Sequence, residues 1–200
     1  MSKIAQTQTD KPVGEDIFKT INHFMFKKSF LIVTLIYTFF IGNAQVSSNT
    51  TSDTSKLSAV ASLNRGNQYY GQKNYEDAVK WYQQSANDNN AEGMTSLGYM
   101  YANGLGVKGD YSVAAKWYLK GAQSGNARAM SYIGMLKENG AGVTKNLKEA
   151  LTWYTKAANA GNAMGMFRLA SLYETGNGIT KDLTQALKWY KSAASKYVTQ

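Results

Sequence analysis

The sequence predicts an all-α protein, an α/α superhelical solenoid of about four helix-turn-helix repeats. Three observations lead to this prediction. Trp81, Trp117, Trp153 and Trp189 follow one another at intervals of 36 residues, and a fixed period of this length indicates a repeat array. Apolar residues recur at helical spacing within each period. Paired glycines separate the two helical stretches of each of the later periods.

An apolar run stands near the N-terminus. Residues 30–41 read FLIVTLIYTFFI, which is shorter than the ~20 residues that a membrane-spanning helix needs. Lys27 and Lys28 directly precede the run, and the small residues of Gly42-Asn43-Ala44 follow it. A basic pair, an apolar core and a small-residue exit are typical of a signal peptide. Cleavage is expected before Gln45.

The leader sets the expected organisation of the N-terminal part. Residues 25–44 form a complete signal peptide on their own, so residues 1–24 are expected to be an upstream mis-start or an extension. Residues 45–57 are polar and read as a flexible linker. The mature chain is expected in the bacterial periplasm or outside the cell, without a stable membrane span. The alternative is a long form that keeps the apolar run as a membrane anchor.

The residue types in the chain exclude several kinds of chemistry. There is no cysteine, and the only histidine, His23, precedes the apolar run. The mature chain would then lack the commonest zinc ligands and the usual general base of serine and cysteine hydrolases. We therefore expect no metal, no cofactor and no enzymatic activity.

The chain is basic, with a formal net charge of +9 and a pI near 9.5. Such a charge raises the question of nucleic-acid binding. The basic residues, however, are scattered along the repeats and form no block. The distribution therefore predicts no nucleic-acid partner.

The first helix of each unit has one apolar face. In residues 91–103, Met94, Leu97, Gly98 and Tyr101 stand at helical spacing. The next two units repeat this stripe with Met130, Ile133 and Gly134, and with Met166, Leu169, Ala170 and Tyr173. Lys137 stands where a tyrosine is expected, so its stem should cover the apolar face while the amine reaches water.

The second helix of each unit begins at a residue that caps helices well. These residues are Asn74, Asp110, Asn146 and Asp182. The Trp-Tyr pair of each second helix is interpreted as packing. The small residues Gly98, Gly134 and Ala170 of the first helices should let the two helices approach closely.

Glycine pairs mark the connection between the two helices of the later units, as in Gly104-Leu-Gly106-Val107. A phosphate-binding loop would need a preceding strand and a following Lys-Ser/Thr, and both are missing. The glycines are interpreted as left-handed turn positions.

The segment LGYMYANGLGVKGDYSVAAKWYLKGAQSGNARA resembles the Sel-one-like repeat family, an α-solenoid related to tetratricopeptide repeats. The units are expected at residues 58–89, 90–125, 126–161 and 162–197. The first unit lacks the glycine-bearing insert and is more similar to an ordinary tetratricopeptide repeat.

The resemblance implies a scaffold that binds a protein or peptide partner in a concave groove lined by the first helices. With the small residue at the centre of each first helix taken as equivalent, the groove-facing positions are Asn67, Tyr70, Thr95, Tyr99, Arg128, Ser131, Met135, Glu138, Phe167, Ser171 and Glu174. An adaptor or regulatory role is therefore expected.

Two alternatives remain open at this point. An immunity or inhibitor protein would use the same partner-binding surface. An exported hydrolase of the β-lactamase-like repeat type is suggested by cysteine-rich relatives, and Glu138 with Glu174 would then have to lie within ~5 to 10 Å of each other. Weak self-association is also expected, because the last second helix is followed by no further unit in the sequence.

Overall fold

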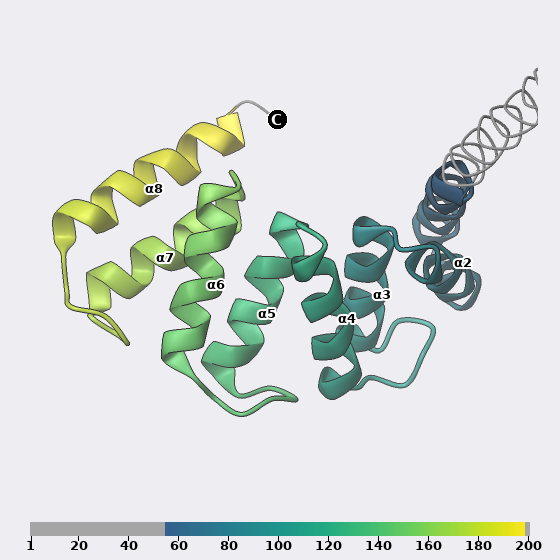
Figure 1. Cartoon of the computed structure of the whole chain (residues 1–200), viewed down its shortest axis with the longest axis horizontal. Coiled ribbons are helices and arrows are strands. Elements are labelled where there is room, and N and C mark those ends of the chain that lie inside the picture. The colour runs from purple at the N-terminus through teal and green to yellow at the C-terminus, as the bar shows by residue number, and fades with distance from the viewer. Residues whose placement is uncertain (1–54, 199–200) are drawn as a thin grey trace, which may run out of the picture. The chain divides into compact units, whose positions relative to one another are not determined.

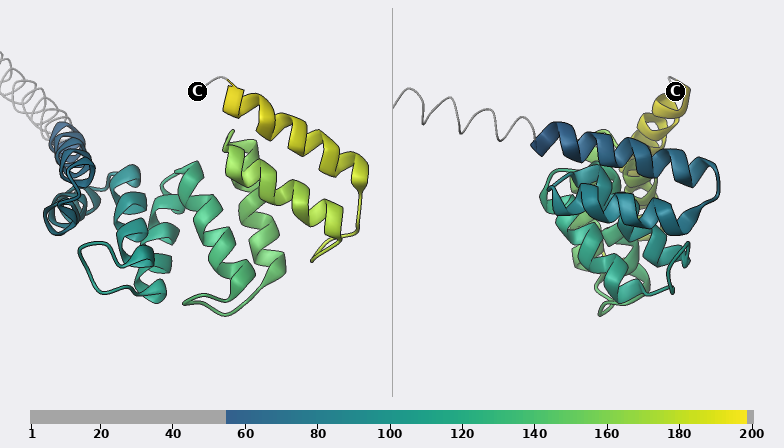
Figure 2. Two further views of the ribbon diagram at one scale, coloured as in Figure 1. Left: turned by 180° about the vertical axis from the view of Figure 1, so that it is seen from behind. Right: turned by 90° about the vertical axis from the view of Figure 1, so that its right-hand side faces the viewer.

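The computed structural model describes residues 55–198, and all regular structure in this range is helical (Figure 1). A helix of residues 55–71 comes first. It is followed by α2 (Tyr75–Asn87), α3 (Ala91–Asn103), α4 (Tyr111–Gln123), α5 (Ala127–Asn139), α6 (Leu147–Asn159), α7 (Ala163–Thr175) and α8 (Leu183–Val198). Each helix packs against the next, so two-helix units stack in chain order (Figure 2). The predicted fold class is confirmed.

The expected N-terminal segments fall largely outside the described residues. This holds for residues 1–24, for the signal peptide 25–44 and for most of the linker 45–57. The last three residues of the predicted linker, 55–57, are already helical in the structure. Within residues 55–198, no helix combines the length and the apolar character that a membrane crossing requires.

Asparagine and aspartate residues begin the helices, as the sequence predicts for the second helix of each unit. The Asp110 carboxylate accepts hydrogen bonds from the amides of Ser112 and Val113 at 2.8 and 3.1 Å. The first helices are capped in the same way by asparagines 36 residues apart, Asn90, Asn126 and Asn162. The caps satisfy amides that have no partner inside the helix.

The two helices of a unit touch where a glycine meets a tyrosine ring. A Cβ added at Gly134 would lie 2.8 Å from the Tyr154 ring, and one added at Gly98 would lie 2.7 Å from the Tyr118 ring. Both tyrosines are buried. The predicted close approach is therefore confirmed, and only glycine gives these rings enough room.

The tryptophans of the second and third units are less buried than the tyrosines beside them. Trp117 and Trp153 are half-buried, and each packs against the hydrophobic cluster of the preceding unit. A lysine amine lies over the ring in both cases, Lys120 at 4.4 Å and Lys156 at 4.6 Å from the ring centroid. Packing is confirmed as a role of these rings, and each ring also contacts a cation.

The inter-helix loops join each unit to the one before it. Gly106 and Gly142 have φ angles of 67°. A Cβ at Gly142 would lie 2.3 Å from the backbone carbon of Tyr111, in the preceding unit. Positive φ and close backbone contact both require glycine, so the interpretation as left-handed turns is confirmed.

Lys137 does not end in water as expected. Its amine lies 2.7 Å from the Glu149 carboxylate, and its side chain is only 21% exposed. Glu149 lies in the first turn of α6, beside the lysine stem, and the Lys137 amine therefore forms an ion pair with it.

Candidate functional site

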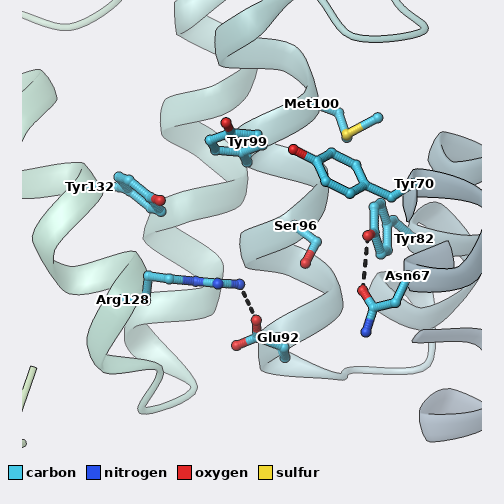
Figure 3. A pocket seen from close by; sticks show the side chains of 9 residues that line it. All are labelled: Asn67, Tyr70, Tyr82, Glu92, Ser96, Tyr99, Met100, Arg128 and Tyr132. Atoms are coloured by element: carbon cyan, nitrogen blue, oxygen red, sulfur yellow. Dashed lines mark hydrogen bonds and ion pairs between the residues drawn. The ribbon is translucent and has the colours of Figure 1, made fainter. Parts of the chain in front are cut away.

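A pocket of about 390 Å³ opens between the first helices of successive units (Figure 3). Its walls come from the helix of residues 55–71 and from α2, α3 and α5. The lining residues are Asn67, Tyr70, Tyr82, Glu92, Ser96, Tyr99, Met100, Arg128 and Tyr132. The pocket is therefore built by three consecutive units and exists only when they are stacked.

Tyrosine rings form a continuous series along this pocket. The ring centroids of Tyr70 and Tyr99 are 6.4 Å apart, and those of Tyr99 and Tyr132 are 6.3 Å apart. The series is extended by Tyr75 at 5.5 Å from Tyr70 and by Tyr118, which stacks on Tyr132 at 4.8 Å. Edge and tilted contacts of this kind hold the rings in place. The result is an aromatic wall that crosses from the first to the third unit.

One ion pair bridges two units at the pocket. The Arg128 guanidinium of α5 pairs with the Glu92 carboxylate of α3, and both side chains are nearly half exposed. The Asn126 side-chain amide donates to the same carboxylate at 2.7 Å. Figure 3 shows the guanidinium extending from α5 toward Glu92. An exposed ion pair of this kind exchanges partners at little cost.

Burial raises the pKa of two tyrosines that line the pocket, Tyr82 and Tyr132. It raises the pKa of Tyr82 to about 12, and the Tyr82 hydroxyl donates a hydrogen bond to the Asn67 side-chain oxygen at 2.9 Å. The pKa of Tyr70 is raised first by the interaction of its hydroxyl with the Tyr99 side chain and then by burial. At neutral pH the pocket therefore offers hydroxyl donors beside one guanidinium.

Four of the predicted groove residues line this pocket, namely Asn67, Tyr70, Tyr99 and Arg128. Two others have to be corrected, because Thr95 and Ser131 are fully buried. The Thr95 hydroxyl donates to the Ala91 carbonyl at 2.7 Å, and the Ser131 hydroxyl donates to Asn162 at 2.8 Å. They lie in the packing between helices, where no partner can reach them.

The remaining predicted residues lie outside the pocket, on α5 and α7. Met135 is half-buried against the cluster of α6 and α7. Phe167 is 49% exposed and contacts the Tyr190 ring at 5.4 Å between centroids. Ser171 is half-buried. These positions belong to the later units and have no shared cavity with Tyr99.

Glu138 and Glu174 each have an internal partner. Glu138 accepts a hydrogen bond from the Tyr154 hydroxyl at 2.7 Å, and Glu174 accepts one from Tyr190 at the same distance. Each carboxylate therefore serves its own unit, and the arrangement gives no support to an acid-base pair. Among residues 55–198, no group of three His, Cys, Asp or Glu side chains is placed to hold a metal ion.

Five pocket residues were not predicted: Tyr82, Glu92, Ser96, Met100 and Tyr132. Tyr82 belongs to a Trp-Tyr pair that was assigned entirely to packing, and its hydroxyl reaches the pocket all the same. Glu92 and Tyr132 stand outside the positions selected around the central glycines. The sequence contains one pattern that could have indicated the ion pair. Glu92 and Arg128 occupy the same position in successive units and have opposite charges.

The fold and the pocket define the class: a helical repeat scaffold with a tyrosine-lined groove between its first helices. The sequence model of the Sel1 repeat, which is the repeat called Sel-one-like above, matches residues 59–90, 91–126, 127–162 and 163–197. The chain belongs to the Sel1 repeat family. The family model matches all four units. This includes the first unit, which connects its helices by a short turn at residues 72–74.

Solved structures of the same family are similar to this chain. The crystal structure of a Sel1 repeat protein from Oxalobacter formigenes has a TM-score of 0.66 at 34% identity, and the match covers 69% of this chain and 57% of that one. A protective antigen present in uropathogenic Escherichia coli strains has a TM-score of 0.65 at 32% identity, with coverage of 69% and 30%. The chain thus spans little more than half of the first protein and under a third of the second. No curated protein matches the chain.

Proposed function

We propose that this chain is an exported adaptor that holds a segment of a partner protein in the groove between its first helices. Membership of the Sel1 repeat family supports a scaffold that binds proteins. The leader of residues 25–44 supports export to the periplasm or the cell exterior. The observation that carries the proposal is the tyrosine series Tyr70, Tyr99 and Tyr132 beside the exchangeable pair of Arg128 and Glu92.

Tyrosine and arginine are the side chains that most often dominate binding energy at protein interfaces. In this pocket the rings are held by one another and lose little freedom when a ligand binds. Arg128 gives up only an exposed ion pair when it turns to a ligand. A partner segment therefore meets a surface that is already ordered. This favours a bound segment over a passive spacer role.

Site-specific photo-cross-linking tests the groove. A benzoylphenylalanine placed at Tyr99 keeps an aromatic group in the pocket, and the same residue at Tyr111, 51% exposed on α4 and outside the pocket, is the matched control. In cells that express the chain, we expect a discrete adduct from position 99 and none of the same mass from position 111. Equal adducts from both positions, or adducts from position 111 alone, would show that partners bind elsewhere.

Export has a separate test. N-terminal sequencing of the protein isolated from its native cells should find Gln45 as the first residue. A retained Met25 would favour the anchored form, and a retained Met1 would show that residues 1–24 are translated and kept.

A further inference from the structure

A buried tyrosine repeats through the array, but its hydrogen-bond acceptor does not. Tyr118 and Tyr154 lie 36 residues apart, and each ring packs on the central glycine of its own first helix, with added-Cβ distances of 2.7 and 2.8 Å. The two hydroxyls therefore occupy corresponding places on the groove side of their units. Tyr154 donates to Glu138 at 2.7 Å.

The acceptor position of the second unit holds alanine. Glu138 stands four residues after Gly134, and Glu174 stands four residues after Ala170. The corresponding residue, four after Gly98, is Ala102, which has no side-chain acceptor. The second unit thus keeps the tyrosine and lacks the carboxylate.

The Tyr118 hydroxyl has no hydrogen-bond partner among residues 55–198, although the residue is only 1% exposed. In the same range, no fully buried side-chain oxygen or nitrogen is left without a partner. The hydroxyl of Tyr118 must therefore be the part of the residue that retains access to solvent. An almost buried donor without an acceptor is costly unless water or a ligand satisfies it.

This donor lies beside the pocket, although Tyr118 is not among the residues that line it. Tyr118 stacks on Tyr132, which lines the pocket, and the charge of Arg128 acts on both hydroxyls. The carboxylate that lines the pocket, Glu92, is already held by Arg128 and Asn126. A carboxylate that enters the pocket beside Tyr132 would come close to this hydroxyl and to a guanidinium whose present partner is exposed.

From this juxtaposition we infer that the groove takes an acidic peptide segment, and that an Asp or Glu side chain of the partner occupies the place that Glu138 and Glu174 fill in the later units. The partner carboxylate accepts a hydrogen bond from Tyr118 in the field of Arg128. Apolar residues on either side of it lie against Tyr70 and Tyr99. The inference rests on the proposed groove function and adds the chemistry of the ligand.

The probes are two peptides that differ only in the carboxylates. One is an N-acetylated, C-amidated pentapeptide of alternating leucine and aspartate, and the other has asparagine in place of aspartate. Titration is followed by the ring signals of ¹³C-labelled tyrosines in NMR, which detect millimolar affinities. We expect the aspartate peptide to bind about tenfold more tightly, which corresponds to about 1.4 kcal/mol.

Two variants test whether this preference depends on the missing hydrogen-bond acceptor of Tyr118. Tyr118→Phe removes a hydroxyl that has no internal partner, so the melting temperature should stay within about 2 °C while the aspartate preference falls below about twofold. Ala102→Glu should also abolish the preference, because its new carboxylate takes the Tyr118 hydroxyl as Glu138 takes that of Tyr154. Tyr111→Phe removes an exposed hydroxyl of the same helix and should leave the preference unchanged.

Other outcomes overturn the inference. Equal binding of both peptides would show that no carboxylate is selected, and it would leave the groove proposal intact if the cross-link at position 99 persists. An aspartate preference that survives in both Tyr118→Phe and Ala102→Glu would place the carboxylate elsewhere. Failure of either peptide to bind up to about 5 mM would also contradict the inference.

Discussion

The Tyr154 hydroxyl donates a 2.7 Å hydrogen bond to Glu138 while its ring fills the space above Gly134. One residue thus joins the two helices of its unit in two ways. The bond reaches a carboxylate, and bonds to charged groups contribute more to stability than neutral ones. In the preceding unit Tyr118 makes the same ring contact without the bond.

Tyr154→Phe should therefore lower the free energy of unfolding by about 1 to 2 kcal/mol. The phenylalanine keeps the ring on Gly134 and leaves Glu138 without its donor. Tyr118→Phe is the matched control and should change the same quantity by less than about 0.5 kcal/mol. Urea unfolding followed by circular dichroism measures both. Equal losses would mean that Tyr118 has an internal partner after all.

Gly134→Ala should destabilise the fold. The new methyl group would lie 2.8 Å from a tyrosine ring that is fully buried and cannot move aside. Overpacking of this kind costs about 1 to 3 kcal/mol, which exceeds the gain of roughly 1 kcal/mol from the better helix propensity of alanine. Gly71→Ala, at a helical position with no atom within 4 Å of the added Cβ, should be neutral or stabilising. Thermal unfolding of the two variants decides between these outcomes, and two equal melting temperatures would argue against the close approach.

Stability should fall in alkaline solution because buried tyrosines resist ionisation. Burial raises the pKa of Tyr82 to about 12, and it also raises the pKa values of Tyr118 and Tyr154. A tyrosine ionises near pH 10 in the unfolded chain. Since the folded-state pKa values are higher, these groups contribute their full stability below about pH 10 and lose it as the pH rises through their folded-state pKa values, which for Tyr82 is about 12.

Absorbance at 295 nm and circular dichroism during one alkaline titration measure this effect. We expect Tyr82, Tyr118 and Tyr154 to ionise above pH 10, together with the loss of helix. Ionisation of all tyrosines in a single step near pH 10, without unfolding, would contradict the burial of these rings.

The outer face of α8 should cause weak self-association. Leu183 and Leu187 are 60% and 55% exposed, whereas their counterparts in the preceding unit, Leu147 and Leu151, are half-buried. Exposed leucines that are covered in an internal unit favour contact with another apolar surface. Light scattering over a concentration series should show a rising mean mass for the wild type and a constant mass for Leu187→Glu. A constant monomer mass for both proteins would refute the expectation.

The repeat and its helices can be predicted from the sequence alone. The 36-residue period, the capping residues and the helical spacing of apolar side chains are local features, because each depends on neighbours within one or two turns. Gly98 and Gly134 were sufficient to predict where the two helices of their units touch, since the missing side chain allows the tyrosine ring to approach. The four units of the Sel1 repeat follow from these features.

Which side chains share a surface depends on how the units stack, and it is seen in the three-dimensional structure alone. Thr95 and Ser131 stand in the groove register of the sequence, but the stacking of units buries them. In the stacked units, Tyr132 contacts Tyr99 and Glu92 pairs with Arg128, each across the boundary between two units. The sequence shows alanine at position 102, where the later units have glutamate. That this alanine leaves the Tyr118 hydroxyl without an acceptor follows only from the packing of the Tyr118 ring on Gly98. Inter-unit rotation depends on packing across the whole interface, and no local pattern encodes it.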